Sequence, residues 1–388
     1  MKELDFYRIT KNELCPCGSG KKYKSCCLNA KDKDIDEESM IANEKRLNNF
    51  IMGMYRETDY QECIFYDKES CKGKIIGAHT LQNNGVLTKL SEKNHVMMIK
   101  PLVDKFGGKI EFEKVGRNKA TTFSGFCKEH DDKVFTEIEK EPYTGTEKQK
   151  FLYAYRAFAQ EYHKKERLMK SVQKSFKIKP SILRCNGAPH IGNYRYRQLE
   201  MYDINEYKKR FDEAFRLNNF SILEHFEILI ENEYDFAVTS MFTLITDIEN
   251  KVINDTYSKK FERMKSCFIT VVPLENKTLI LLSWLKEDSD VFKSYKEMLE
   301  NLNESELKRY LNNMLPRYTE NIIFSPRLIE SWSDEEKKEF KKVFSGEFPR
   351  LDELFKMDSI NDFGELFKNI FKAKDNFFDN SKYDLFRK

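Results

Sequence analysis

Apolar residues recur at helical spacing in several stretches of the chain. The clearest series consists of aromatic residues at intervals of four, three and four positions, namely Phe151, Tyr155, Phe158 and Tyr162. This period places the rings on one face of a helix. Thr146 precedes the series and can cap the helix N-terminus, so we predict a long helix that runs to Lys170 or beyond. Similar spacing predicts further helices at residues 38–56, 204–217, 220–232, 288–314, 333–345 and 359–373.

Short apolar runs bounded by glycine or polar residues predict β-strands. They lie at residues 96–99, 110–115, 121–126, 236–245, 267–272 and 278–284. We expect turns at Gly107 and Gly108 and at residues 116–118, and a β-hairpin formed by the last two strands. Residues 178–197 contain two prolines and two glycines and are predicted to form a loop. The mixture of helices and strands predicts an α+β fold.

Composition excludes wholesale disorder, because 40% of the residues are hydrophobic and 31 Phe with 19 Tyr can fill cores. The net charge of +3 is uninformative, but Lys148 to Lys179 holds ten Lys or Arg against two Glu. A long basic helix with interleaved tyrosines can follow a phosphate backbone, so nucleic acid is one expected partner. The alternative is a solvated face, on which His163 would be exposed.

The chain shows no sign of a membrane or export segment. No run of 18 apolar residues is present, and the start, Met-Lys-Glu-Leu-Asp, lacks the apolar core of a signal peptide. Nine cysteines in such a chain are typical of metal ligands in a reducing cytosol. We therefore expect a cytoplasmic protein without a membrane partner.

Four cysteines lie within thirteen residues near the N-terminus: Cys15, Cys17, Cys26 and Cys27. Four thiolates this close in sequence can surround one tetrahedral Zn²⁺. A segment of this size has few large apolar side chains, so the metal would supply its folding energy. Free thiols or two disulfides are the alternatives, although vicinal and C-x-C pairs would form strained bridges.

Residues 15–27, Cys-Pro-Cys-Gly-Ser-Gly-Lys-Lys-Tyr-Lys-Ser-Cys-Cys, closely resemble the SEC-C motif. That zinc finger is best known from the C-terminus of the bacterial preprotein translocase ATPase, where it docks a chaperone and the ribosome. The resemblance covers residues 13–28. It implies a zinc ion and a docking surface for a ribosome or protein partner, and it says little about the remaining chain.

A second set of metal-ligand residues is spread over a longer stretch: Cys63, Cys71, Cys127 and His130. Two ligands on an early knuckle and two at the start of a later helix describe a treble-clef zinc site. Cys127 and His130 share one helical face, and the helix dipole favours the thiolate. The alternative is that Cys63 and Cys71 are ordinary buried thiols and that His130 lies at the surface.

His79 follows an apolar strand and precedes Thr-Leu-Gln-Asn-Asn. This arrangement resembles the first histidine of HNH-type nucleases, which use a ββα metal fold often braced by a treble-clef zinc. The resemblance covers residues 60–140. It implies that His79 is the general base, that Asn83 or Asn84 orients it and that Asp131, alone or with His130, reaches a catalytic Mg²⁺ or Mn²⁺. The blocks 79–82, 94–96 and 120–127 also resemble parts of uncharacterised bacterial proteins found near phage-defence genes.

The sequence also departs from the nuclease pattern. The gap between His79 and the helix is longer and contains an extra β-ribbon, and no separate third histidine remains once His130 binds zinc. A structural or zinc-binding role for His79 therefore stays open.

These features predict a multidomain α+β protein. Its parts are a zinc finger at 1–30, a linker and helix at 31–59, an HNH-like treble-clef domain with the basic helix at 60–175, and an α+β domain of unknown role at 176–388. The leading hypothesis is a cytosolic zinc protein with a metal-dependent nuclease domain that acts on DNA or RNA. Phage defence is one setting in which we expect such a protein. The alternative is a non-enzymatic zinc-finger adaptor that binds a ribosome, nucleic acid or a protein.

Overall fold

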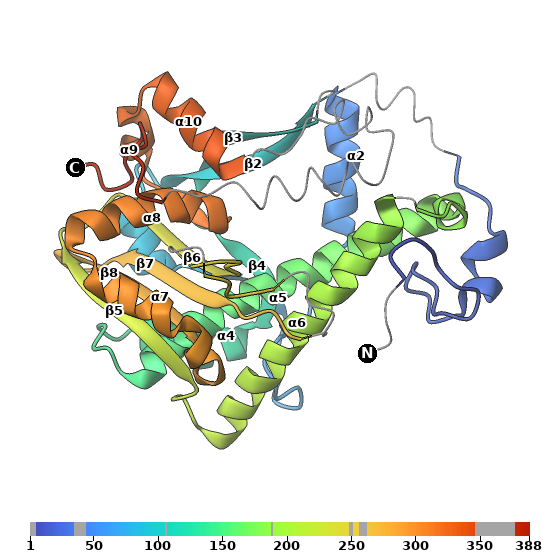
Figure 1. Ribbon diagram of the computed structural model, residues 1–388, viewed down its shortest axis with the longest axis horizontal. Helices are drawn as coiled ribbons and strands as arrows, with labels where there is room; N and C mark the ends of the chain where they lie inside the picture. The colour runs from blue at the N-terminus through green and yellow to red at the C-terminus, as the bar shows by residue number, and fades with distance from the viewer. Residues whose placement is uncertain are drawn as a thin grey trace.

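The architecture is that of a computed structural model, which describes residues 5–34, 44–104, 107–187, 189–247, 251–255, 262–345 and 377–388 (Figure 1). One large antiparallel sheet lies at its centre, with helices on both faces. The strands follow one another across the sheet as β3 (Gly107–Gly116), β2 (His95–Asp104), β9 (Ile322–Phe324), β6 (Phe236–Phe242), β7 (Cys267–Pro273), β8 (Lys277–Leu285) and β5 (Leu223–Glu231). The predicted mixture of helices and strands is confirmed.

The central strands are buried on both faces of the sheet. Every residue of β6 and β7 is buried, and these strands consist of apolar runs rather than alternating apolar and polar residues. Neighbouring residues point to opposite faces: Met241 belongs to the core on the side of α5, and Phe242 to the core on the other side. The β7–β8 hairpin pairs Phe268 with Ser283 and Pro273 with Thr278, as the sequence predicts.

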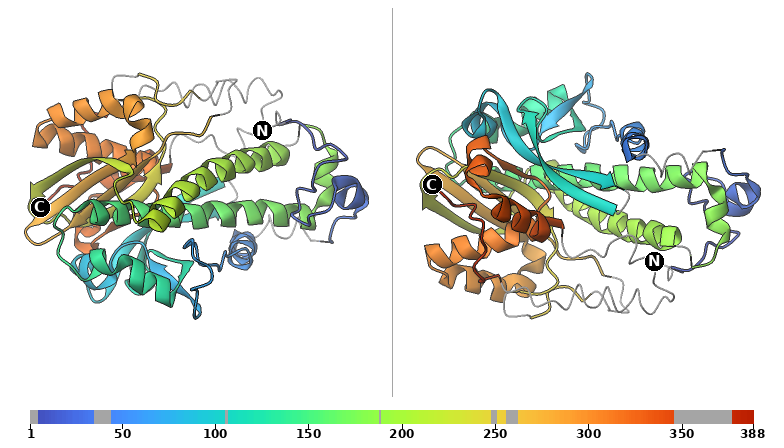
Figure 2. Two further views of the ribbon diagram at one scale, coloured as in Figure 1. Left: turned by 90° about the horizontal axis from the view of Figure 1, so that it is seen from below. Right: turned by 90° about the horizontal axis from the view of Figure 1, so that it is seen from above.

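A hairpin of two long helices covers one face of the sheet and projects beyond it (Figure 2). Its helices are α5 (Glu147–Ile178) and α6 (Pro189–Leu217), joined by the 3₁₀ helix η4 (Pro180–Arg184). The side chain of Thr146 accepts a hydrogen bond from the Gln149 amide at 3.1 Å, so the predicted cap is confirmed. The predicted aromatic series is also buried, and Phe158 stacks on Phe211 with 4.8 Å between the ring centroids.

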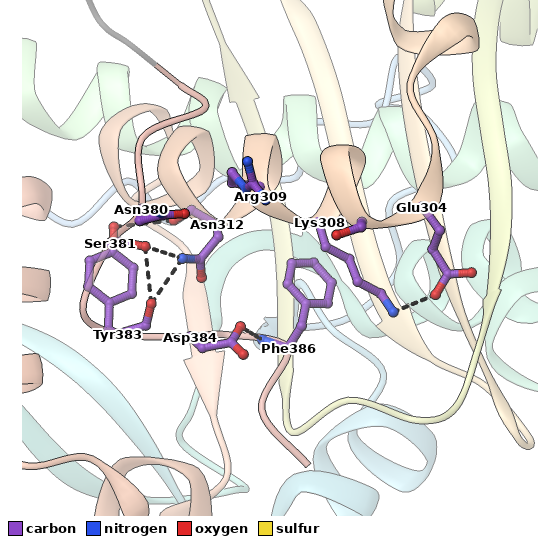
Figure 3. A pocket seen from close by; sticks show the side chains of 10 residues that line it. Glu304, Lys308, Arg309, Asn312, Asn380, Ser381, Tyr383, Asp384 and Phe386 are labelled. Carbon is purple, nitrogen blue, oxygen red and sulfur yellow. Dashed lines mark hydrogen bonds and ion pairs between the residues drawn. The ribbon is translucent and has the colours of Figure 1, made fainter.

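The opposite face of the sheet carries a second layer of helices. They are η5 (Lys286–Asp288), α7 (Ser289–Asn301), α8 (Glu304–Tyr318), α9 (Pro326–Ser331) and α10 (Asp334–Ser345). Residues 377–388 pack onto α8 beside a pocket of about 600 Å³, where Asn312 bonds the segment (Figure 3). Trp284, Phe292 and Tyr310 are fully buried in this layer.

A smaller unit packs against α5. The strands β1 (Ile75–His79) and β4 (Thr122–Cys127) pair antiparallel, and α4 (Lys128–Glu139) follows β4 directly. Between these two strands the chain forms a π-helical turn, η3 (Asn83–Leu87), a short helix, α3 (Thr88–Leu90), and the ribbon of β2 and β3. Residues 44–57 form α2 (Glu44–Glu57), and the N-terminal segment contains η1 (Tyr23–Ser25) and η2 (Cys27–Asn29).

Several predicted elements are wrong. The predicted helix at 220–232 is the strand β5, because Leu223, Phe226 and Ile230 have helical spacing but are buried on two different faces of the sheet. The predicted loop at 178–197 is helical from Pro189 onwards, and Gly107 and Gly108 lie in β3 rather than in a turn.

Other predicted elements are shifted or divided. The helix at 288–314 is two helices, because Leu302 and Asn303 are extended and a capping box of Asn303 and Glu306 starts α8. Of the helix at 38–56, residues 44–56 are confirmed within α2. The predicted helix at 359–373 lies outside the described residues.

Residues from both larger predicted domains, such as Tyr155 and Phe268, share one core.

Candidate metal centres and an adjoining cavity

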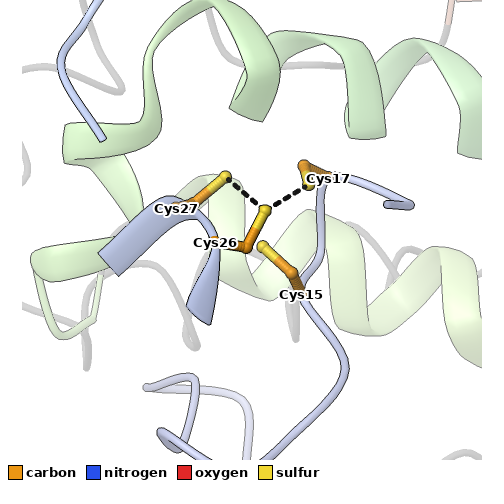
Figure 4. Close-up of side chains that lie close together, drawn as sticks. All are labelled: Cys15, Cys17, Cys26 and Cys27. Carbon is orange, nitrogen blue, oxygen red and sulfur yellow. Dashed lines mark hydrogen bonds between the residues drawn. The ribbon is translucent and has the colours of Figure 1, made fainter. Parts of the chain in front are cut away.

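The N-terminal cysteines converge on one point. The sulfur atoms of Cys15, Cys17, Cys26 and Cys27 all lie within 4.8 Å of one another, and none forms a disulfide (Figure 4). The Cys26 sulfur lies 3.6 Å from that of Cys17 and 3.9 Å from that of Cys27. Four sulfurs about 2.3 Å from a tetrahedral Zn²⁺ are themselves about 3.8 Å apart, so this donor set fits zinc.

Local backbone geometry brings the first two cysteines together. The Cys15 amide donates to the Lys21 carbonyl at 2.7 Å and closes a tight loop. Gly18 has a φ of 73°, a left-handed conformation that favours glycine. A Cβ atom at Gly18 would also lie 2.6 Å from Oε1 of Gln173 on α5, so the loop passes close to the long helix. The hydroxyl oxygen of Ser19 lies 3.2 Å from the Cys26 sulfur.

The thiols of Cys15, Cys17 and Cys27 have shifted pKa values. Burial raises the pKa of Cys17, but hydrogen bonds from Ser19, Cys15 and Cys26 outweigh it and lower the pKa to about 7. Burial raises the pKa of both Cys15 and Cys27. Metal binding must therefore displace protons from these two thiols, and it weakens on acidification.

The second predicted ligand set also converges. The ligand atoms of Cys63, Cys71, Cys127 and His130 lie within 4.8 Å of one another. Nδ1 of His130 is 3.3 Å from the Cys63 sulfur, 3.4 Å from that of Cys71 and 3.3 Å from that of Cys127. Three thiols and an imidazole nitrogen at these separations fit a closed zinc site.

The position of each ligand follows from its element. Cys127 ends β4 and is the N-cap of α4, so His130 lies in the first turn of that helix. Cys63 and Cys71 come from the loop before β1, which the Ile64 amide joins to the Gly125 carbonyl at 2.8 Å. A metal here would therefore hold this loop, β4 and α4 together.

Sequence reasoning missed a partner of His130. Its Nε2 lies 2.9 Å from the hydroxyl oxygen of Ser70. When a metal binds Nδ1, Nε2 carries the proton and donates a hydrogen bond to the Ser70 hydroxyl. The Phe65 ring lies 4.5 Å from the imidazole, centroid to centroid, and packs in turn against Phe215 on α6.

A cavity of about 170 Å³ lies next to this second centre. It is lined by His79, Gln82, Asn83, Asn84, Asp131, Glu139 and Lys140. His79 is the last residue of β1, and Asp131 lies in the first turn of α4. The three residues to which the sequence analysis assigns catalysis, His79, Asn83 and Asp131, thus line one cavity.

The cavity contains a histidine and a carboxyl group with shifted acidities. Burial lowers the pKa of His79, whose Nε2 lies 3.3 Å from the Arg117 carbonyl oxygen. Burial raises the pKa of Asp131 to about 6, against the opposing effect of the Arg156 guanidinium. Oδ1 of Asp131 has no hydrogen-bond partner among the described residues. Arg156 itself pairs with Glu139 and lies 4.1 Å from the centroid of the Phe135 ring.

Asn83 makes other contacts than the predicted one to His79. Its amide nitrogen donates to Oδ1 of Asn118 at 3.1 Å, and its Oδ1 accepts from Nη1 of Arg117 at 3.4 Å. Asn83 therefore joins the turn after β1 to the turn before β4. The group bonded to His79 is the Arg117 carbonyl, which sequence reasoning did not identify because a backbone acceptor leaves no sequence signal.

Comparison with known proteins adds one finding. The family model of the SEC-C motif matches residues 12–29. These residues contain the four converging cysteines, and we refer to residues 5–34 as the SEC-C finger. No curated protein and no solved structure matches the chain at a significant level.

The basic residues of α5 are largely paired with acids from other elements. Lys148 binds Glu137 at 2.6 Å. Further pairs join Lys164 to Glu320 at 2.8 Å, Lys165 to Glu200 at 3.0 Å, and Arg156 to Glu139. Much of the positive charge of this helix is therefore paired with carboxylates in the fold.

His163 is buried, not solvated as predicted from the basic run. It is 4% exposed, and its Nε2 lies 3.4 Å from a carboxylate oxygen of Asp59.

The structure contains no described helix with both the length and the apolar character that crossing a bilayer requires.

Proposed function

We propose that the chain is a metal-dependent nuclease of HNH type, braced by zinc, whose reaction takes place in the cavity at His79. The observation that carries the proposal is that His79 and Asp131 line this one cavity, although 51 intervening residues separate them in the sequence. Two antiparallel strands followed by a helix surround it, with the Cys63–His130 ligand set alongside. A cavity of about 170 Å³ is suited to a phosphate group with a few waters.

His79 would act as the general base. Its Nε2 donates to the Arg117 carbonyl, which leaves the lone pair of Nδ1 as the proton acceptor. Burial lowers the pKa of His79, so the ring is neutral at pH 7 and can take a proton from a water molecule. The bond to Arg117 also fixes the ring orientation.

Asp131 would hold the divalent cation. When bound, Mg²⁺ or Mn²⁺ would stabilise the negative charge that develops on the phosphate and leaving oxygens. A carboxylate is a preferred ligand for either ion, and the unpartnered Oδ1 of Asp131 supports this assignment. Among the described residues the cavity holds no group of three closely spaced ligands, so substrate oxygens and water would complete the coordination.

The Cys63–His130 centre would have a structural role in this reaction. It joins the loop before β1 to the start of α4 and so fixes Asp131, the neighbour of His130. Its four protein ligands leave no open position for substrate.

The test is a cleavage assay on supercoiled plasmid DNA and total RNA with Mg²⁺ or Mn²⁺. His79→Ala should lower the rate by about 10²–10⁴-fold, the usual contribution of a general base. His95→Ala is the matched control, because His95 is an exposed histidine bonded to the Lys93 carbonyl at 2.8 Å. Absence of cleavage in wild type, or equal rates in wild type and His79→Ala, would refute the proposal. A role in phage defence stays a prediction, tested by plaque counts with the same variants.

A second candidate function is that of an adaptor. Lys21, Lys22 and Lys24 are exposed on the SEC-C finger, and Leu14 is 67% exposed beside them in sequence. Such a surface is suited to an acidic partner such as the ribosome. Reversal of the three lysines to Glu should then abolish co-sedimentation with ribosomes, whereas His79→Ala should not. A His79→Ala variant that no longer cleaves nucleic acid but still co-sediments with ribosomes would show that the two functions are separate.

A further inference from the structure

The SEC-C finger packs against the far end of the α5–α6 hairpin (Figure 2). Its buried residues and those of the hairpin end form one apolar cluster. The hairpin contributes Phe176 from α5, Leu183 from η4, and Ile191 and Tyr194 from α6. The finger contributes Ile9, Cys15, Cys17, Tyr23 and Cys27. In the part of the chain that the structure describes, this cluster is separate from the three clusters that surround the sheet.

A buried arginine joins the hairpin to the finger. Arg195 of α6 is 2% exposed, and its Nε donates to the Asp5 carbonyl at 2.8 Å. Its Nη2 donates to the Arg8 carbonyl at 3.1 Å and to a carboxylate oxygen of Glu13 at 2.7 Å. These charge-assisted bonds satisfy backbone carbonyls of the finger that would otherwise be left without a donor.

The connecting turn η4 makes further contacts. Nη1 of Arg184 donates to the Leu28 carbonyl at 3.1 Å and to the Ala30 carbonyl at 3.0 Å. The Ser181 amide donates to Asp32 at 2.9 Å. Both ends of the finger segment are thus bonded to the turn or to α6.

Among the described residues, neither the finger nor the far end of the hairpin has another core in which to bury its apolar side chains. The finger is too small to fold on apolar burial alone, so its structure depends on the metal. The side chains of Phe176, Leu183 and Ile191 are buried only in the cluster that the finger completes. Without a folded finger they would be exposed at the end of a helix pair that projects beyond the sheet.

We propose that metal binding by Cys15, Cys17, Cys26 and Cys27 folds the end of the α5–α6 hairpin, and that the SEC-C finger is a metal-dependent cap of this hairpin rather than an independent module. The face of the finger that contains Tyr23 and Cys27 is covered by the hairpin. A partner of the finger must therefore bind residues that the hairpin leaves exposed, such as Lys21 and Lys22.

Hydrogen exchange of the full chain, followed by mass spectrometry, tests the proposal. The variant Cys26→Ser/Cys27→Ser removes two finger ligands and leaves the Cys63 centre intact. Amides of residues 172–194 should exchange at least about tenfold faster than in wild type, while those of β7 and β8 keep their rates. The matched control is Cys185→Ser, since Cys185 is exposed on the adjoining turn and belongs to neither ligand set.

A second variant, Arg195→Ala, retains all the thiols. It should keep the wild-type zinc content and still accelerate exchange at residues 187–194, because the finger then binds metal but is less firmly attached. Faster exchange confined to residues 5–30 in the cysteine variant would overturn the proposal. Acceleration that extended to β7 and β8 would overturn it too, because the finger would then control the whole fold rather than the hairpin end.

Discussion

His130 uses its two ring nitrogens for different contacts. Nδ1 faces three sulfurs, and Nε2 lies 2.9 Å from the Ser70 hydroxyl. A hydrogen bond to the second nitrogen of a ligating histidine fixes the ring and its tautomer, and its loss weakens metal binding. Ser70 is therefore part of the second centre although it is not a ligand.

We predict that Ser70→Ala weakens zinc binding at the second centre by about 10–100-fold, the usual effect of removing such a partner. The measurement is competition with a chromophoric zinc chelator. Ser70→Thr keeps the hydroxyl and should restore affinity close to that of wild type. Equal affinities for wild type and Ser70→Ala would show that Ser70 does not orient His130.

His225 gives a prediction about pH. Burial lowers the pKa of His225 to about 4, with Lys150 adding to the effect and Glu147 opposing it, and Nδ1 lies 2.8 Å from the Ser283 hydroxyl. In the unfolded chain the imidazole titrates near pH 6.5. Between about pH 6.5 and 4 the unfolded state therefore binds the extra proton, and the folded state loses up to about 3 kcal/mol relative to it.

The variant His225→Asn retains a donor or acceptor near Ser283 but does not titrate. Its free energy of unfolding should therefore fall less than that of wild type as the pH drops from 7 to about 4.5. Chemical denaturation at several pH values measures the difference. Parallel pH profiles for the two proteins would contradict a buried neutral His225.

Cysteine and histidine positions in the sequence allowed both converging sets of candidate ligands to be predicted residue by residue. Cys15 to Cys27 are so close in sequence that few other arrangements exist, and Cys127 with His130 has the spacing of one helix turn. Ser70 and the Arg117 carbonyl could not be predicted in this way. Serine is too common a residue to indicate a site by itself. A backbone carbonyl is present in every residue and so cannot be recognised from the sequence.

At the scale of elements, residues 377–388 complete the core beside α8. Residues 377–388 lie along α8, with Tyr383 1% and Leu385 0% exposed. Asn312 of α8 accepts from the Leu385 amide at 2.8 Å. It also donates to the Tyr383 carbonyl at 3.0 Å (Figure 3). One side chain thus pairs two buried backbone groups.

We predict that Asn312→Ala lowers the free energy of unfolding by about 1–3 kcal/mol, because it leaves the Leu385 amide buried without a partner. The Tyr383 carbonyl, in contrast, still accepts from the Ser381 hydroxyl. Denaturant titration provides the measurement. Asn301→Ala, at the exposed end of α7, is the matched control and should change stability by less than about 0.5 kcal/mol. A loss no larger than that of the control would mean that water replaces Asn312.

Helices with a single apolar face and strands made of a mostly apolar run, such as β7, were predicted well, whereas β5 was not. The aromatic spacing of α5 identifies one helical face, and Thr146 marks its start. In β5, Leu223 and Phe226 are buried on opposite faces, and their three-residue spacing imitates a helix. The start of α6 was wrongly predicted to be a loop because prolines and glycines are frequent at residues 178–197, although proline is also favoured in the first turn of a helix, where Pro189 lies.

At the scale of the whole molecule, two ligand sets lie at different places along one helix pair. The SEC-C finger covers the far end of the α5–α6 hairpin, and the second centre lies against α6 through Phe65 and Phe215. This arrangement could not be deduced from the sequence, because the two sets share no ligand and nothing in the sequence relates one to the other. The ion pairs of α5 could not be predicted either, because the acidic partners of Lys164 and Lys165, Glu320 and Glu200, are distant in sequence.

Zinc content of the purified full chain, measured by elemental mass spectrometry, tests most directly whether both ligand sets are metal centres. We predict two zinc ions per chain in wild type. Cys26→Ser/Cys27→Ser and Cys63→Ser/Cys71→Ser should each retain one, because the two centres share no ligand. A value of one or less in the wild-type protein, or two ions retained in either variant, would contradict the account.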